Sequence, residues 1–256
     1  MIPLKDENPT TTTPVVTVIL IAACVLVWVG VQQGGQREDN DAFTFQTAAI
    51  PCEVVQGRPL TVEEVRDTVQ FDDETACTSS PVTEPFFPDK NEYLALLYSM
   101  FMHGSWIHLL GNMLFLWVFG NNIEDRLGTA KYLGFYVVAG VVATAAHIAV
   151  QPASTVPLVG ASGAIAGVMG MYLVLFPNVQ IRSLILLGFF ILFRDISAKW
   201  LLGIWLVSQF FVNPNEGVAW MAHVGGFVFG VMAGLLLRAT GEPEPQPYPS
   251  PTPWRY

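Results

Sequence analysis

The chain has 256 residues, of which 52% are hydrophobic and 13% are charged, and its formal net charge is −9. Soluble domains carry about 25% charged residues, so this composition indicates a protein with several segments in a lipid bilayer. The acidic balance excludes nucleic acid as a partner, because nucleic-acid binding requires a basic face.

Apolar runs recur along the chain, and a helix needs about 20 apolar residues to cross a bilayer. The first run, Val15–Val31, has only Lys5 before it and no small-residue cleavage site after it, which predicts a retained anchor and not a cleaved signal peptide. The run Ser183–Phe193 is too short to cross and lies between two arginines, which favours an interfacial or re-entrant segment. We expect six spans, near residues 15–31, 105–121, 131–150, 160–177, 199–213 and 217–237.

Two segments are polar. Residues 34–92 form an insert with 13 acidic and 4 basic residues, and residues 239–256 form a proline-rich tail that is predicted to be disordered. The chain is therefore expected to divide into a short N-terminus (1–14), a membrane domain that includes the insert (15–238), and the tail.

The basic residues predict the orientation. Seven of them fall on one side of a six-span arrangement: Lys5, Arg126, Lys131, Arg182, Arg194, Lys199 and Arg238. The short loops on the other side, 151–159 and 212–216, contain no Lys or Arg. The positive-inside rule then predicts that both termini are cytoplasmic, in a bacterial-type plasma membrane, and that the acidic insert faces outward. In that location Cys52 and Cys77 either form a disulfide or remain two unpaired surface cysteines.

Two polar residues lie in apolar spans near their outer ends. Ser162 begins the fourth span within Gly160-Ala161-Ser162-Gly163, and His223 comes early in the sixth. Polar and ionisable groups are costly in lipid and usually functional there. Both spans run inward, so the two side chains should lie at a similar shallow depth. A serine nucleophile with a histidine base indicates a protease whose active site lies below the membrane surface.

Glycines follow both of these residues at four-residue or near-four-residue spacing. They are Gly163, Gly167 and Gly170 in the fourth span, and Gly226, Gly230 and Gly234 in the sixth. Such spacing lets two helices approach closely in lipid, which would bring the serine to its base. The alternative is an ordinary helix-dimer face.

The second span carries His103, His108 and Asn112. His108 and Asn112 are four residues apart and share a helix face, at the same outer depth as Ser162. Together with the Ser162 backbone N–H they could donate hydrogen bonds to an oxyanion. A metal site is the alternative, but no carboxylate accompanies the histidines and no His-Glu-x-x-His occurs, so neither metal nor cofactor is expected. His147, alone in the third span, is expected to be structural.

In combination these motifs resemble the rhomboid family of intramembrane serine proteases, over about residues 92–238. The motifs are His103-x4-His108-x3-Asn112, Glu124-x-Arg126, Gly160-Ala161-Ser162-Gly163 and Ala222-His223-x2-Gly226-x3-Gly230. The resemblance implies an all-α, polytopic bundle of six transmembrane helices that cleaves transmembrane segments of other proteins without a cofactor. It implies a Ser162–His223 dyad without a carboxylate and an oxyanion hole completed by His108 and Asn112. It also implies that Glu124 and Arg126 brace the cytoplasmic turn after the second span.

Two positions depart from the family pattern. The family often has an aromatic residue four positions after the serine, stacked on the histidine; here that residue is Ala166, and a fifth-span aromatic such as Trp205 is the expected substitute. The family also often has Trp-Arg where this chain has Leu94-Ala95. The competing class is a non-catalytic relative that binds membrane clients without cutting them. Such relatives typically lack the serine or the histidine, and both are present here.

Overall fold

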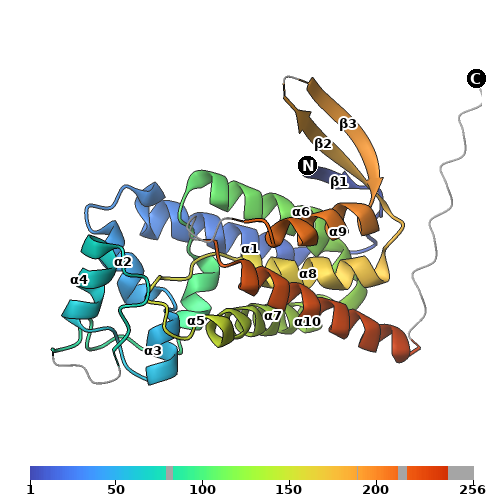
Figure 1. Ribbon diagram of the computed structural model, residues 1–256. Helices are drawn as coiled ribbons and strands as arrows, with labels where there is room; N and C mark the ends of the chain where they lie inside the picture. Colours follow the sequence, from blue (N-terminus) through green and yellow to red (C-terminus); the bar gives the residue numbers. More distant parts are fainter. Residues whose placement is uncertain (79–82, 189, 213–217, 242–256) are drawn as a thin grey trace, which may run out of the picture.

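The computed structural model describes residues 1–78, 83–188, 190–212 and 218–241. A bundle of longer helices forms the main body, with a lobe of short helices at one end and a small sheet at the other (Figure 1). The longer helices are α1 (Val15–Leu26, continued by the π-helical turn η1, Val27–Val31), α6 (Trp106–Leu127), α7 (Thr129–Val150), α8 (Ser162–Leu175), α9 (Ala198–Gln209) and α10 (Trp220–Ala239). Residues 242–256 of the expected disordered tail lie outside the described part of the chain.

A helix lies at each of the six places where the sequence predicts a span. Among the described residues, α7 and α10 are long and apolar enough to cross a membrane by length and composition. The α1–η1 segment and α8 are apolar but shorter. The number of crossings therefore remains a prediction.

Helix α8 is the centre of the bundle. It contacts α6, α7, α9 and α10, and most of its residues are buried. It begins with the hydrogen bond from the Ile165 N–H to the Ala161 carbonyl, at 3.0 Å, and ends before Pro177, which cannot continue a helix. Its first residue is Ser162, so the bundle holds the start of α8 from several sides.

Small residues allow α8 to lie against its neighbours at backbone distance. A Cβ added to Gly226 of α10 would collide with the carbonyl oxygen of Gly163, and one added to Gly230 would collide with that of Gly167. Gly163 also faces α7, where the Cβ of Ala143 would lie 2.7 Å from an added Cβ. The glycines of α8 thus allow close packing against α7 as well as against α10. The contact with Ala143 of α7 was not predicted.

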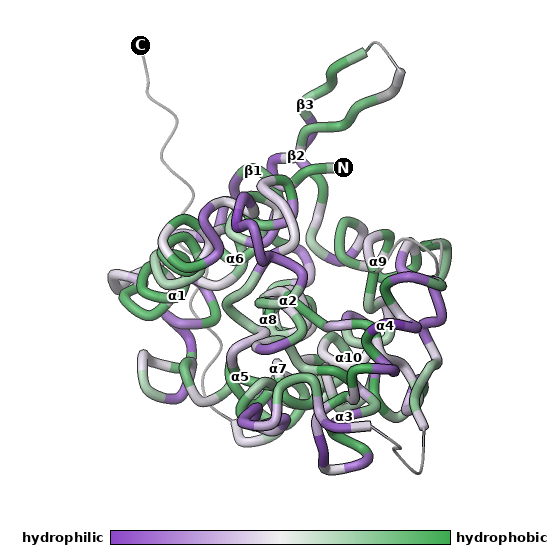
Figure 2. The backbone as a smooth tube through the Cα atoms, turned by 90° about the vertical axis from the view of Figure 1, so that its left-hand side faces the viewer, coloured by the Kyte–Doolittle hydropathy of each residue, from purple (hydrophilic) through white to green (hydrophobic). Residues whose placement is uncertain are grey.

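The prediction of a helical protein is confirmed in part: the protein is mostly helical, but it also contains a three-stranded antiparallel sheet that the sequence did not predict. Its strands, in the order β1-β2-β3, are β1 (Ile2–Asp6), β2 (Gln180–Leu187) and β3 (Phe190–Ser197). The run Ser183–Phe193, expected to be an interfacial or re-entrant segment, belongs to the β2–β3 hairpin, which projects from the body and is mostly hydrophobic (Figure 2). A short apolar run does not distinguish a strand from a helix. The strand that completes the sheet, β1, lies at the other end of the sequence, so the run itself gave no sign of its partner.

Strand β1 fastens the N-terminus to the bundle. The Asp6 side chain is 7% exposed, and its Oδ2 accepts hydrogen bonds from the Asn122 amide at 2.5 Å and from the Tyr172 hydroxyl at 2.9 Å. Burial raises the pKa of the Asp6 carboxyl to about 6, and the hydrogen bonds only partly offset that effect. The expected short N-terminus is therefore an ordered part of the fold.

The acidic insert forms the lobe. Its helices are α2 (Asn40–Thr47), α3 (Pro51–Gln56) and α4 (Val62–Phe71), and α5 (Ala95–Tyr98) and η3 (Ser99–Phe101) follow. The lobe has its own small core of Phe45, Ile50, Cys52, Leu60 and Val65. Of the two alternatives for the cysteines, the structure has the Cys52–Cys77 disulfide. The sulfur atoms of these cysteines and a carboxylate oxygen of Glu64 lie close enough together to share a metal ion. The disulfide, however, leaves no thiolate to bind one.

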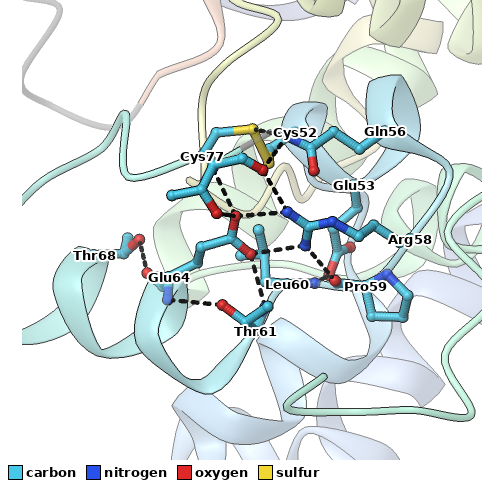
Figure 3. A network of polar contacts seen from close by, with 11 residues as sticks. Cys52, Glu53, Gln56, Arg58, Pro59, Leu60, Thr61, Glu64, Thr68 and Cys77 are labelled. Carbon is cyan, nitrogen blue, oxygen red and sulfur yellow. Dashed lines mark hydrogen bonds and ion pairs between the residues drawn. A yellow bond between two sulfur atoms is a disulfide. The ribbon is translucent and has the colours of Figure 1, made fainter. Parts of the chain in front are cut away.

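A polar network surrounds that disulfide (Figure 3). The Glu64 carboxylate accepts hydrogen bonds from the Arg58 guanidinium at 2.8 and 2.9 Å and from the backbone N–H groups of Thr61 and Thr78. Burial favours a raised pKa for Glu64, but these donors outweigh it and lower the pKa to about 2. Glu64 and Thr61 also form a capping box at the start of α4. The lobe is therefore held together by side chains of its own.

Candidate active site

Ser162 and His223 meet where α8 lies against α10. Ser162 is the first residue of α8, and His223 is in the first turn of α10. The Nε2 atom of His223 lies 2.8 Å from the Oγ atom of Ser162, which is a hydrogen-bond distance. The close glycine packing between the two helices makes this approach feasible for a side chain as short as serine. The structure thus brings together the two residues that the sequence singled out.

The other side of the imidazole faces the end of α9. The Nδ1 atom of His223 lies 2.7 Å from Oε1 of Gln209, and the ring centroid of Trp205 lies 5.9 Å from that of the imidazole, at 43°. Ala166, at the position where the rhomboid pattern often has an aromatic residue, is fully buried. Sequence reasoning missed Gln209; its only signal was a polar residue at the end of an apolar span.

Gly160 allows two further side chains to approach the start of α8. Its φ is +125°, and an added Cβ would lie 2.7 Å from Nε2 of His108 and 3.6 Å from Nδ2 of Asn112. Any side chain at this position would therefore be strained and would displace the His108 ring. His108 and Asn112 thus converge on the backbone at Gly160, two residues before Ser162.

The groups around this point are hydrogen-bond donors. Nδ1 of His108 accepts the Gly104 N–H at 3.4 Å, so the neutral ring carries its proton on Nε2, which faces Gly160. Within the described residues, Nδ2 of Asn112 is buried without a hydrogen-bond partner. The backbone N–H of Ser162, in the first turn of α8, has no partner within the helix. An unsatisfied buried donor costs about 1–3 kcal/mol, and retaining one fits a role in binding an acceptor.

Two hollows adjoin Ser162. The larger, of about 260 Å³, is lined by residues that include His108, Asn112, Ser162, Trp205 and His223. The smaller, of about 40 Å³, is lined by residues that include Leu158, Gly160, Ser162, Gly163 and Ala222. The serine hydroxyl therefore lies between a cleft lined by the His108 and Asn112 donors and a narrow cavity lined in part by glycine and alanine.

The other two predicted histidines, His103 and His147, do not touch the Ser162–His223 pair directly. His103 is buried, and its ring centroid is 5.1 Å from that of His108. The Gln32 side chain holds the His103 backbone by accepting its N–H at 2.9 Å and donating to its carbonyl at 2.8 Å. His147 is buried in α7 beside a separate cavity of about 60 Å³. His103 thus packs against the His108 ring, and Gln32 holds the His103 backbone in place. The role of Gln32 could not be seen in the sequence.

Glu124 lies near the end of α6, at the opposite end of the bundle from Ser162. Its carboxylate accepts the backbone N–H groups of Val16 and Thr17, each at 2.8 Å. These are free N–H groups of the first turn of α1, so Glu124 caps that helix across the bundle. Arg126 follows in the last turn of α6. Glu124, which was expected to support the turn after the second span, links the end of α6 to the start of α1 through these hydrogen bonds.

The lobe is hydrogen-bonded to the segment that leads to Ser162. The Thr155 N–H donates to the Glu74 carbonyl at 2.8 Å, and the Leu158 N–H donates to the Ala49 carbonyl at 2.8 Å. Closer to the serine, the Gly160 N–H donates to the Ser99 carbonyl, also at 2.8 Å. The position of the loop before α8 therefore depends on the lobe.

A helical bundle that holds a serine–histidine pair beside a group of hydrogen-bond donors has the arrangement of a hydrolase site. A sequence model of the Rhomboid domain matches residues 90–240, more than half of the chain, and the chain belongs to the rhomboid family. This family of membrane proteins includes serine proteases.

Relatives come from mitochondria and from bacteria. The presenilin-associated rhomboid-like protein A, mitochondrial, of Danio rerio is 27% identical over 220 residues, which are 84% of this chain and 51% of the relative. The putative rhomboid protease YdcA of Bacillus subtilis is 31% identical over 154 residues, 57% of this chain and 66% of the relative. The rhomboid protease GluP of the same bacterium is 28% identical over 148 residues, 58% and 27% of the two chains. The chain thus spans about half the length of the mitochondrial relative.

Proposed function

We propose that this protein is an intramembrane serine endopeptidase that hydrolyses peptide bonds in or near transmembrane segments of other membrane proteins. The observation that carries the proposal is the 2.8 Å contact between Nε2 of His223 and Oγ of Ser162, beside a cleft lined by the unsatisfied amide of Asn112. Membership of a family that includes serine proteases supports it.

The geometry suggests the following reaction. Nε2 of His223 accepts the hydroxyl proton of Ser162 while Oγ attacks the carbonyl carbon of the substrate. The developing oxyanion accepts hydrogen bonds from Nε2 of His108, Nδ2 of Asn112 and the Ser162 backbone N–H. His223 then gives the proton to the leaving amine, and an acyl group remains on Ser162. Water, deprotonated by the same histidine, attacks the acyl carbon; the bond to Oγ of Ser162 breaks as His223 returns the proton to that oxygen, so no cofactor takes part.

The proposed topology has six spans, with both termini in the cytoplasm and the lobe outside. The distribution of basic residues supports this orientation, as does the disulfide, because disulfides persist in oxidising compartments. The division into residues 1–14, 15–238 and 239–256 is kept as part of this proposal. A bacterial-type plasma membrane is likewise proposed, from the sequence alone, since the relatives include both mitochondrial and bacterial proteins.

The test is cleavage of a transmembrane substrate by the purified protein in liposomes. We expect wild type and Ser197→Ala, a control serine at the start of α9, to cleave a fluorogenic transmembrane peptide, and Ser162→Ala and His223→Ala to be inactive. Because the two groups act as a unit, the double variant should be no slower than either single variant. Turnover by folded Ser162→Ala at the wild-type rate would refute the proposal.

A further inference from the structure

Gln209 is placed so that its amide can have only one orientation. It is the last residue of α9 and is 7% exposed. Its Nε2 lies 3.1 Å from the Trp205 carbonyl oxygen and 3.3 Å from Oγ of Ser208. A carbonyl can only accept a hydrogen bond, and Ser208 donates its own proton to the same carbonyl at 2.6 Å. Both neighbours therefore require the NH₂ group, and Oε1 must face the other way, toward His223.

This orientation determines which nitrogen of His223 carries the proton. Oε1 of Gln209 can only accept, and it lies 2.7 Å from Nδ1 of the imidazole. The tautomer with its proton on Nε2 would bring two lone pairs together at that distance. In the neutral ring the proton is therefore on Nδ1, and Nε2 presents a lone pair to the hydroxyl of Ser162, 2.8 Å away.

The same end of α9 also fixes the plane of the ring. Trp205 packs beside the imidazole, and its backbone carbonyl is the group that anchors the Gln209 amide. Helix α9 contacts both α8 and α10, which carry the serine and the histidine (Figure 1). One turn of α9 thus supplies both the packing and the hydrogen bond that hold the histidine.

We propose that Gln209 is a positioning residue that holds His223 in the tautomer and orientation required of a general base. The inference rests on the proposed function of Ser162 and His223 and adds a neutral third member to that pair. A neutral amide orients the ring, but it does not balance the positive charge that the ring gains during the reaction. Its loss should therefore cost less than the full contribution of a general base, which is about 10²–10⁴-fold.

The test compares a variant that lacks the acceptor with one that keeps it. Gln209→Met has a similar shape and no oxygen, so we expect kcat to fall about 10- to 100-fold while KM changes less than about twofold. Gln209→Glu retains an acceptor for the Nδ1 proton but loses the donor to the Trp205 carbonyl, so it should recover part of that loss. Gln70→Met, on the exposed face of α4, is the matched control and should cleave like wild type.

Nitrogen NMR of ¹⁵N-histidine-labelled protein gives a second readout, with the His223 signals assigned by their absence in His223→Ala. In wild type we expect Nδ1 to be protonated and Nε2 to be bare, and Gln209→Met should lose this single tautomer. A wild-type ring protonated on Nε2, or wild-type kcat in Gln209→Met, would overturn the inference. The proposed function would stand if Ser162→Ala remained inactive in the same assay, and it would fail if that variant cleaved.

Discussion

The unsatisfied amide of Asn112 is, at the residue scale, the feature that links stability to function. The surrounding fold buries Nδ2 and offers it no acceptor among the described residues. A group with only a structural role would rarely be left in that state. An oxyanion that forms near Gly160 would supply the missing acceptor.

Replacing this amide should therefore separate activity from stability. We expect Asn112→Ala to lower kcat about 10²–10³-fold, the usual effect of removing one oxyanion donor. Its melting temperature should not fall by more than a few degrees, because the substitution also removes an unsatisfied buried group. Cleavage rates and thermal unfolding on the same preparation would check both. An unchanged rate would remove Asn112 from the site.

The narrow cavity beside Ser162 predicts substrate preference. Its volume of about 40 Å³ leaves room only for a small side chain, although glycines and alanines form part of its lining. Substrates with Ala directly before the cut should be cleaved faster than those with Leu, and the difference should appear mainly in kcat/KM. Matched peptides that differ at this one position would test it, and a preference for Leu would place the scissile bond elsewhere.

The lobe is, at the element scale, the part of the fold that extends the site. It contacts the loop before α8 through backbone hydrogen bonds, and a disulfide closes 25 residues of it. A loop of that length corresponds to a stabilisation of about 3 kcal/mol in the chain-entropy account. A core as small as that of the lobe depends heavily on such a link.

Removing the disulfide should therefore affect both the lobe and the reaction. We expect the variant with Cys52→Ser and Cys77→Ser to become sensitive to proteolysis within residues 34–92 while the helical bundle stays intact. Cleavage should slow, because the loop that precedes Ser162 loses its support. Buried Cys24→Ser is the control for loss of a thiol alone. A wild-type rate from a protein with a proteolysed lobe would show that the loop is held by the bundle.

The elements differ in how far the sequence predicts them. The helices could be placed because length and hydropathy suffice for a long apolar segment. The β2–β3 hairpin could not, since a strand is defined by its partner, and β1 lies at the other end of the chain. Helix α4 did carry a signal, the capping-box pattern from Thr61 to Glu64, which hydropathy alone overlooks. Ser162 and His223 stood out as polar residues in apolar spans, whereas Gln209 and Gln32 acquire their roles only through contacts between distant segments.

The whole molecule should show a pH dependence that originates at Asp6. Its pKa is raised to about 6 from an ordinary value of 3.8, because burial disfavours the carboxylate. The contribution of this group to stability is thus complete below pH 3.8 and is lost as the pH rises through 6, at a cost of about 3 kcal/mol above that.

Asp6→Asn keeps a carbonyl acceptor for Tyr172 and does not titrate. We expect its stability relative to wild type to increase between pH 4 and 6 and to level off at higher pH. Thermal unfolding in detergent at a series of pH values would measure the difference. A difference that is constant across this range would show that the Asp6 carboxyl does not titrate there.

Access to the site constrains substrates at the scale of the whole complex. A client helix shields its carbonyls in backbone hydrogen bonds, and unwinding it in lipid leaves polar groups unsatisfied at several kcal/mol each. Clients with Gly or Pro in the outer half of their span should be cut faster than matched Leu-rich ones. Mass spectrometry of the products should locate the cut near the outer end of the span. Cuts in the cytoplasmic half would contradict the proposed topology.

The most direct test of the central claim is covalent trapping of the nucleophile. A fluorophosphonate reacts with a serine that has been activated by a neighbouring base, and peptide mass spectrometry identifies the modified residue. We expect a single adduct on Ser162 in wild type, almost none in His223→Ala, and loss of cleavage in proportion to labelling. An adduct on another serine, or full labelling with cleavage unchanged, would contradict the account.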